Sequence, residues 1–260
     1  MTRRGWGRAK GWAGLSGLLG ALLIAAPALA SDADLQKRVE DRLAKAGLEQ
    51  KGSIQVAVTD GAVTLDGFTL TVDARRDAER AAGKVSKKVE SRLVVRPEPV
   101  SDAKVQKAAA EAILREPRYD VFDSVGVAVT DGVVLLGGSV RQPWLKDALD
   151  RRVGEVPGVR DIRNEIRVAP ASTFDDRLRA QLYRRIYGDD MFVRYSNWAS
   201  PPIRIVVENG RVTLTGLVNS SVEQVRLGMI ARGTLAFKVT NSVEVESERP
   251  KEPAPTSQQS

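Results

Sequence analysis

The amino-acid sequence predicts an α+β fold made of three tandem small domains, each with the element order α-β-β-α-β. Three observations support this prediction: one hairpin pattern occurs three times, amphipathic helical segments flank every copy, and short proline-containing segments separate the copies. A repeat of this kind indicates one supersecondary unit per copy. The hairpin copies are residues 54–67 (IQVAVTDGAVTLDG), 125–138 (VGVAVTDGVVLLGG) and 203–216 (IRIVVENGRVTLTG).

Each hairpin alternates apolar and other residues, turns at Asp-Gly or Asn-Gly, and alternates again up to a second glycine. Alternation with a period of two indicates a half-buried strand, and these dipeptides tolerate the positive φ angles of a two-residue hairpin turn. We interpret the glycines as structural turn and strand-exit residues, because the lysine that completes a phosphate-binding P-loop is missing. The glycine pairs are Gly61 and Gly67, Gly132 and Gly138, and Gly210 and Gly216.

Helical stripes of apolar residues precede and follow each hairpin. In the third copy the first stripe runs from Leu178 to Ile186 with a spacing of four, which is typical of an amphipathic helix. We expect Val222, Val225 and Met229 to form the buried stripe of the second helix. An alternating third strand then completes a three-stranded mixed sheet, and a right-handed helical crossover leads to it.

The two helices of each unit need the same apolar sheet face, so we expect them to cover one face and leave the other open. In the second copy we expect the valines of the first strand, with Val133 and Leu135, to face the helices. The open face then carries an apolar surface, which a small domain normally hides. Its members are Gly126, Ala128, Val134 and Leu136. We therefore predict that Val134 and Leu136 contact a neighbouring repeat or a partner.

Changes in composition divide the chain into five parts. The predicted domains are residues 31–96, which form the most degenerate copy, 101–168 and 172–246. Linkers RPEP and APAS separate them, and prolines and small residues are typical of such joints. The polar tail at 247–260 is expected to be disordered.

Residues 1–30 read as a signal peptide. Four basic residues precede an uncharged apolar run that ends in Ala28-Leu29-Ala30, a pattern that predicts export and cleavage after Ala30. The alternative is an uncleaved N-terminal membrane anchor, because about twenty uncharged residues can just span a bilayer. We expect a periplasmic or secreted protein.

Composition excludes most enzyme chemistry. The chain has no cysteine and no histidine, which removes thiolate and imidazole nucleophiles and nearly all zinc, haem and iron–sulfur ligand sets. Adjacent acids such as Asp175-Asp176 lack an accompanying nucleophile or oxyanion device, so we interpret them as solvated helix-start residues. We expect no catalytic residues, no cofactor and no metal.

The positive charge is concentrated in the predicted signal peptide. Four of the 40 basic residues and none of the 33 acidic residues lie in residues 1–30, which leaves 36 against 33 and a net charge of +3. Nucleic-acid binders carry a concentrated basic face, whereas both signs alternate along this chain. We therefore expect no nucleic-acid partner.

The three copies resemble the BON (bacterial OsmY and nodulation) domain family. Its pattern joins an alternating strand, an Asp/Asn-Gly turn, V-x-L-x-G, a helix, a Gly-Val pair and an asparagine in the third strand. In the third copy Leu235-Ala236 replaces Gly-Val, and in the first copy Val85-Ser86 stands there and Ser91 replaces the asparagine. The fullest match is the second copy, with Asp131-Gly132, Leu135, Gly138, Gly158-Val159 and Asn164.

The resemblance implies a non-enzymatic periplasmic or envelope protein that is associated with osmotic or envelope stress and binds phospholipid surfaces. In similar two-domain proteins that bind anionic lipid, an aromatic residue at the start of the last domain's first helix is linked to the membrane. Phe174 occupies the similar position here, followed by Arg177 and Arg179. Because Phe174 also continues the apolar stripe of its helix, core packing is the alternative.

Two further groups are candidate contacts for a membrane or partner. Trp144 and Lys146 begin a helix, where an aromatic residue beside cations suits a headgroup layer or packs at the helix entry. An unusually long loop at 188–202 is a candidate recognition surface, or it folds over the open sheet face of its own domain. Its apolar members are Met191, Phe192, Tyr195 and Trp198.

Two function classes therefore remain from the sequence. The first is weak binding of anionic phospholipid surfaces in envelope or osmotic stress protection. The alternative is a protein-interaction or holdase-type module that uses the apolar open face of the second copy. The sequence does not determine the oligomeric state.

Overall fold

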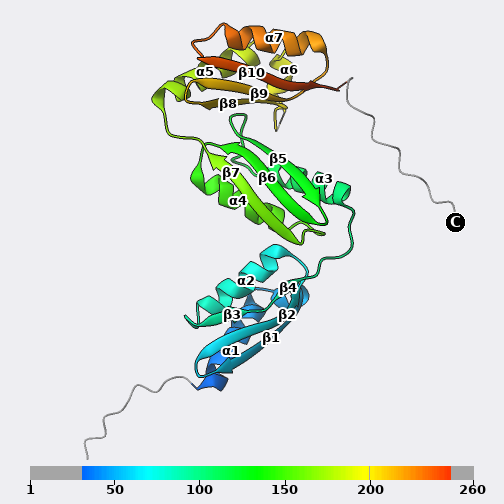
Figure 1. The fold of residues 1–260 in the computed structure, drawn as a ribbon, viewed down its shortest axis with the longest axis vertical. Helices are drawn as coiled ribbons and strands as arrows, with labels where there is room; N and C mark the ends of the chain where they lie inside the picture. Colours follow the sequence, from blue (N-terminus) through cyan, green and yellow to red (C-terminus); the bar gives the residue numbers. More distant parts are fainter. Residues whose placement is uncertain (1–30, 199, 247–260) are drawn as a thin grey trace, which may run out of the picture.

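The computed structural model describes residues 31–198 and 200–246. They form three α+β units that follow one another along the long axis of the molecule (Figure 1), which confirms the predicted fold class. The signal peptide predicted at 1–30 and the tail predicted to be disordered at 247–260 lie outside the described residues.

Each unit has the predicted element order, with small additions. Domain 1 contains α1 (Asp32–Lys45), the 3-10 turn η1 (Leu48–Gln50), β1 (Gly52–Thr59), β2 (Ala62–Thr69), α2 (Val72–Gly83), β3 (Val89–Ser91) and β4 (Val94–Val95). Domain 2 contains α3 (Asp102–Leu114), β5 (Ser124–Thr130), β6 (Val133–Val140), α4 (Pro143–Gly154) and β7 (Asp161–Val168). Domain 3 contains α5 (Thr173–Tyr187), α6 (Val193–Ser196), β8 (Ile203–Glu208), β9 (Arg211–Val218), α7 (Ser221–Arg232) and β10 (Lys238–Val245).

In every sheet the second hairpin strand is central. It pairs antiparallel with the first strand and parallel with the third, so the strand orders are β5-β6-β7 and β10-β9-β8. In β7 the Asn164 amide donates to the Lys146 carbonyl of α4 at 3.1 Å, and Asn241 makes the same bond to Gln224 of α7 at 2.7 Å. Domain 1 has Ser91 at this position, and its third strand is divided into β3 and β4.

The hairpin glycines have two different roles. At the turn of domain 3, Asn209 and Gly210 have φ angles of 51° and 71°, as a tight two-residue turn requires. Six residues later, a Cβ on Gly216 would lie 1.8 Å from the Pro202 carbonyl oxygen of the neighbouring segment. Only glycine permits that approach. The other two domains repeat both features.

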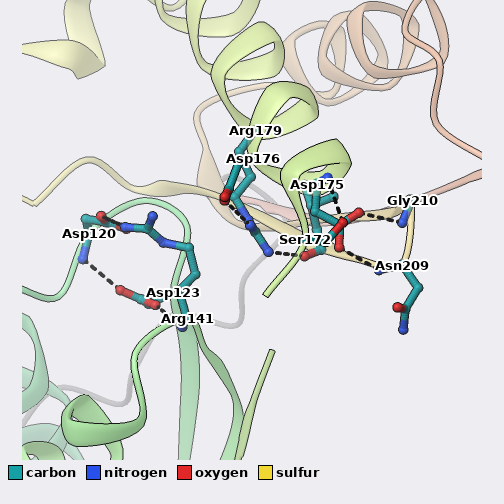
Figure 2. A network of polar contacts seen from close by, with 10 residues as sticks. Asp120, Asp123, Arg141, Ser172, Asp175, Asp176, Arg179, Asn209 and Gly210 are labelled. Atoms are coloured by element: carbon teal, nitrogen blue, oxygen red, sulfur yellow. Dashed lines mark hydrogen bonds and ion pairs between the residues drawn. The ribbon is translucent and has the colours of Figure 1, made fainter. Parts of the chain in front are cut away.

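An aspartate on the first helix clamps each hairpin turn. Asp175 accepts hydrogen bonds from the backbone N–H groups of Asn209 (2.8 Å) and Gly210 (2.7 Å), one to each carboxylate oxygen (Figure 2). Asp32 and Asp102 hold the turns of domains 1 and 2 in the same way. Asp175 is fully buried, so its interpretation as a solvated helix-start residue is wrong.

The predicted apolar open face of domain 2 is also wrong. Val134 and Leu136 are fully buried beneath the helices, whereas Leu135 points outward and is 38% exposed. A two-residue turn pairs Val129 with Val134 and Val127 with Leu136, so inward positions change from odd to even numbers across the turn. The leucine of the V-x-L-x-G pattern in this copy is consequently Leu136 rather than Leu135, in register with Leu65 of the first hairpin.

In domain 3, helix α7 has the opposite orientation to the one expected. Its buried residues include Leu227, Gly228 and Ala231. The predicted inward stripe lies on the outer side, where Val222, Val225 and Met229 are 63%, 59% and 57% exposed. Apolar residues occur on both sides of this helix, so periodicity alone does not select the buried one.

Domain 2 docks on domain 3 through the loop before β5. The Ile205 N–H of β8 donates to the Val121 carbonyl at 2.6 Å, which adds a bridging bond to the edge of the domain 3 sheet. The Val121 side chain packs in the core of domain 3. The Arg204 guanidinium donates to the Asp120 carbonyl at 2.9 Å. A main-chain bond, a shared core and a buried guanidinium therefore join these two domains.

Domain 1 contacts domain 2 through the start of α2. Val72 belongs to the domain 2 core, and Arg76 forms an ion pair with Asp150 of α4. Asp73 is buried next to Gly154, where a Cβ would lie 3.4 Å from the Asp73 nitrogen. Burial, followed by the neighbouring charge of Asp77, raises the pKa of the Asp73 carboxyl.

Candidate functional site

An exposed aromatic pair marks the turn end of domain 3. Phe174, in the first turn of α5, stacks on Phe237, just before β10, with ring centroids 5.4 Å apart and an interplanar angle of 15°. The two side chains are 39% and 78% exposed. Offset stacking stabilises such a pair, but it leaves most of the Phe237 ring in solvent.

Backbone contacts with the hairpin turn fix the position of Phe237. Its N–H donates to the Gly210 carbonyl at 2.8 Å. A Cβ on Gly210 would lie 2.5 Å from the Phe237 ring and 3.1 Å from the Phe174 ring, so the rings rest on the bare backbone of the turn. The clamp from Asp175 holds that turn in place. The hydrogen-bonded hairpin turn therefore fixes the position of the aromatic pair.

We define the domain 3 tip as Phe174, Leu235 and Phe237. Leu235 precedes Phe237 by two residues and is also 78% exposed. Exposed apolar side chains that gather in one place mark interaction sites more often than single ones do.

Basic side chains surround this tip. Arg177 lies one helical turn after Phe174 and is exposed, and Arg211 and Lys238 are exposed partners in the parallel β9–β10 register. The adjacent carboxylate of Asp175 is buried against the turn amides. The tip thus combines apolar rings with outward cations.

Arg179, the other arginine near Phe174, has a structural role. It is 5% exposed, donates to the Val207 carbonyl, and forms an ion pair with Asp176 at 2.7 Å. Figure 2 shows this arginine beside the Asp175 clamp on α5. Of the two arginines that follow Phe174, only Arg177 is available at the surface.

The second predicted contact lies in domain 2. Trp144 begins α4 and is 40% exposed, with the Arg118 guanidinium carbon 5.0 Å from its ring centroid. Lys146 is half-buried. This aromatic–cation pair belongs to a different domain from the tip, so the structure does not unite the two predicted contacts in one cluster.

The long loop of domain 3 places two of its predicted contact residues in the core. Phe192 is fully buried and Tyr195 is 2% exposed, both in the domain 3 core beside α5. The Tyr195 hydroxyl donates to Glu223 of α7 at 2.9 Å. The loop does not cover the open sheet face, since α6 lies with α5 and α7 on the other side of the sheet (Figure 1). Trp198 remains 57% exposed.

A cleft of about 660 Å³ adjoins the tip between domains 2 and 3. Its wall includes Phe237 and Arg211 from the tip side and Arg167 from β7. Glu208 accepts hydrogen bonds from the Ser139 hydroxyl and from Arg167, the latter at 3.0 Å. These bonds cross between the domains, so Glu208 stabilises the domain contact.

The groups with displaced pKa values lie outside the tip. Burial raises the pKa of Asp123 at the base of the domain 2–3 contact, where its carboxylate accepts the N–H groups of Asp120 and Arg141 (Figure 2). Burial also raises the pKa of Tyr187 in the core of domain 3. Within residues 31–198 and 200–246, no cluster of acidic residues is suited to hold a metal ion.

Sequence reasoning missed Leu235 and Phe237. The sequence signal for these two residues was that the third copy departs from the repeat pattern at their positions. Domain 2 has Gly158 and Arg160 at the equivalent positions, as the shared backbone bonds from Arg160 to Gly132 and from Phe237 to Gly210 indicate. A degenerate motif in the third copy thus coincides with the exposed tip.

Comparison with known proteins defines the class of these domains. The BON domain pattern matches residues 31–97, 101–170 and 175–247. Because these three segments make up most of the chain, the protein belongs to the BON domain family. BON domains are associated with the cell envelope and form a non-catalytic family.

Likeness to other proteins is low. A search of curated proteins finds no match. Among solved structures, the C-terminal domain of CdsD, a type III secretion structural protein of Chlamydia trachomatis, is 12% identical, covering 82% of this chain and 97% of that one with a TM-score of 0.25. The periplasmic domain of PrgH from S. typhimurium is 12% identical, covering 78% and 100%, with a TM-score of 0.19. In the part of the chain described here, none of the helices has the length and apolarity to cross a bilayer.

Proposed function

We propose that this chain is an exported, non-catalytic envelope protein that binds anionic phospholipid surfaces through the domain 3 tip, in protection against envelope or osmotic stress. The envelope association of BON domains and the basic, apolar segment at residues 1–30 support the location. The exposed stack of Phe174 and Phe237 is the observation that carries the lipid proposal.

The energetics favour weak, salt-sensitive binding. A basic side chain near an anionic surface contributes about 1 kcal/mol, and Arg177, Arg211 and Lys238 surround the tip. Full burial of an aromatic side chain contributes roughly 1.5–3 kcal/mol, so partial insertion of Phe174 and Phe237 contributes less than this for each ring. Salt screens the first contribution and leaves the second.

The protein-interaction alternative loses its predicted surface. It relied on Val134 and Leu136 as outward residues, and both side chains lie in the core of domain 2. A partner cannot reach them without opening that domain. The lipid proposal depends on neither residue.

Vesicle co-sedimentation tests the proposal. The chain from Ser31 onward is mixed at low salt with vesicles of phosphatidylglycerol and phosphatidylcholine, and in parallel with phosphatidylcholine alone. We expect sedimentation with the anionic vesicles that falls as salt is added. No sedimentation with anionic vesicles at low salt would contradict the proposal.

A further inference from the structure

Helix α7 presents a second apolar surface that the fold leaves uncovered. Val222, Val225 and Met229 are each more than half exposed, and their spacing of three and four residues places them on one side of the helix. The opposite side, with Leu227 and Ala231, packs in the core. We call these three exposed residues the α7 apolar face.

The position of α7 makes this face available to a flat partner. Figure 1 shows α7 at the extreme end of the molecule, on the side of domain 3 that points away from domain 2. The helix ends at Arg232, three residues before Leu235 of the tip. Arg185 of α5 donates to the Gly233 carbonyl in between. The chain therefore continues from the end of α7 into the segment that carries Leu235 and Phe237.

Charge around the face selects among possible occupants. Exposed cations on this side include Arg226, Arg232 and Arg185, whereas Glu223 of α7 is buried and bonded to Tyr195. Asp189 is engaged by Arg226 at 2.7 Å, which lowers the pKa of that carboxyl. A second copy placed on this face would bring arginines against arginines, whereas an anionic lipid surface complements them.

We infer that α7 lies along the membrane surface, with Val222, Val225 and Met229 among the upper acyl carbons and its arginines at the phosphate level. The long arginine side chains keep their charged ends at the headgroups while their stems cover apolar surface. This inference rests on the proposed function and extends it, because it adds the outer side of α7 to the lipid-facing surface of domain 3.

Site-directed spin labelling tests this orientation directly, since the native chain has no cysteine. Labels are attached to V225C, M229C and F237C, and to L114C as the control, an exposed leucine of domain 2. With anionic vesicles, we expect the labels at 225, 229 and 237 to become more accessible to oxygen and less accessible to a water-soluble nickel chelate. The label at 114 is expected to stay unchanged.

The outcomes separate the inference from the proposed function. Protection at 237 without protection at 225 and 229 overturns the α7 orientation and leaves tip binding intact. No change at any label, together with no sedimentation, overturns both. Protection at 225 and 229 without vesicles, with a dimer in light scattering, would assign the face to a second copy and overturn the inference.

Charge substitutions give an independent measure. Because Val225 and Met229 are exposed, V225D and M229D are expected to fold as the native chain does. Each is expected to weaken partitioning onto anionic vesicles about tenfold, a factor that corresponds to about 1.4 kcal/mol. The matched control is V94D, an exposed valine of β4 in domain 1, with an expected change of less than about threefold. Equal effects of V94D and V225D would overturn the assignment to α7.

Discussion

Domains 2 and 3 share one scaffold at the turn end of the sheet but carry different side chains on it. Asp102 and Asp175 hold the two turns with the same pair of backbone bonds. In both domains the residue before the third strand donates its N–H to the turn glycine at 2.8 Å. In domain 2 that residue is Arg160, and in domain 3 it is Phe237.

The neighbouring positions likewise carry exposed apolar side chains in domain 3 and not in domain 2. A Cβ on Gly158 of domain 2 would lie 2.7 Å from Val105, so that end is closed by its own core. Domain 3 has the exposed Leu235 at the equivalent place and Phe174 before the clamp aspartate, where domain 2 has Ser101. The scaffold is common to both domains, so a specific function has to come from the residues that differ.

The largest expected effect is on the scaffold itself. L136D places a charge in the core of domain 2 and is expected to destabilise it by about 4 kcal/mol or more. L135D, on the outward side of the same strand, is expected to cost less than about 1 kcal/mol. Urea denaturation of both variants measures this difference, and equal costs would contradict the strand register.

Removing the clamp carboxylate has the next largest effect. D175A leaves two N–H groups without their acceptor at a buried site, and we expect a loss of about 3 kcal/mol. D102A is expected to cost about 1–2 kcal/mol, because water reaches the partly exposed turn of domain 2. Chemical denaturation distinguishes the two values. A larger loss for D102A than for D175A would show that burial does not determine the strength of the clamp.

The buried carboxylate between domains 1 and 2 predicts a pH dependence of smaller size. The pKa of Asp73 is raised from 3.8 by burial and Asp77, so the folded state disfavours its charged form. The contribution of Asp73 to stability is therefore fully present below pH 3.8 and is lost as the pH rises through the folded-state pKa. We expect D73N to melt at a higher temperature than the native chain at pH 7, with the difference shrinking toward pH 4. A difference that grows on acidification would contradict this assignment, and D41N on the exposed side of α1 is the control.

The smallest expected effect on stability comes from the tip. F237A removes a side chain that is 78% exposed, so we expect a change in unfolding free energy of about 0.5 kcal/mol or less. The same variant is expected to lose most of its binding to anionic vesicles. Thermal unfolding and co-sedimentation of one preparation measure both quantities. A large loss of stability would indicate that Phe237 serves the fold rather than the surface.

The repeated pattern was sufficient to predict the architecture, because turn chemistry and alternation are local properties. The predictions of which faces of β6 and α7 are buried were wrong for identifiable reasons. A two-residue turn changes which numbers point inward, and comparing Val134 with Val63 of the first copy would have revealed this. In α7, Val225 and Leu227 lie on different sides, and only tertiary packing decides between them.

The candidate site was predicted only in part. Phe174 could be selected because the resemblance to the family links an aromatic residue at this position to the membrane, and it lies in the tip. Its partner Phe237 is distant in sequence and becomes adjacent only through the fold. The Asp175 clamp likewise joins residues that are far apart in the sequence. An alignment of the three repeats nevertheless shows an aspartate at this position in every copy.

Exchanging the tip for its domain 2 counterpart tests the central claim most directly. The double variant F174S/F237R installs the residues of domain 2 in domain 3 and raises the net charge by one. If apolar insertion at the tip holds the protein on the membrane, co-sedimentation with anionic vesicles falls by at least about tenfold despite the added positive charge. Unchanged or stronger binding would mean that charge alone holds the protein there and would contradict the role of the domain 3 tip.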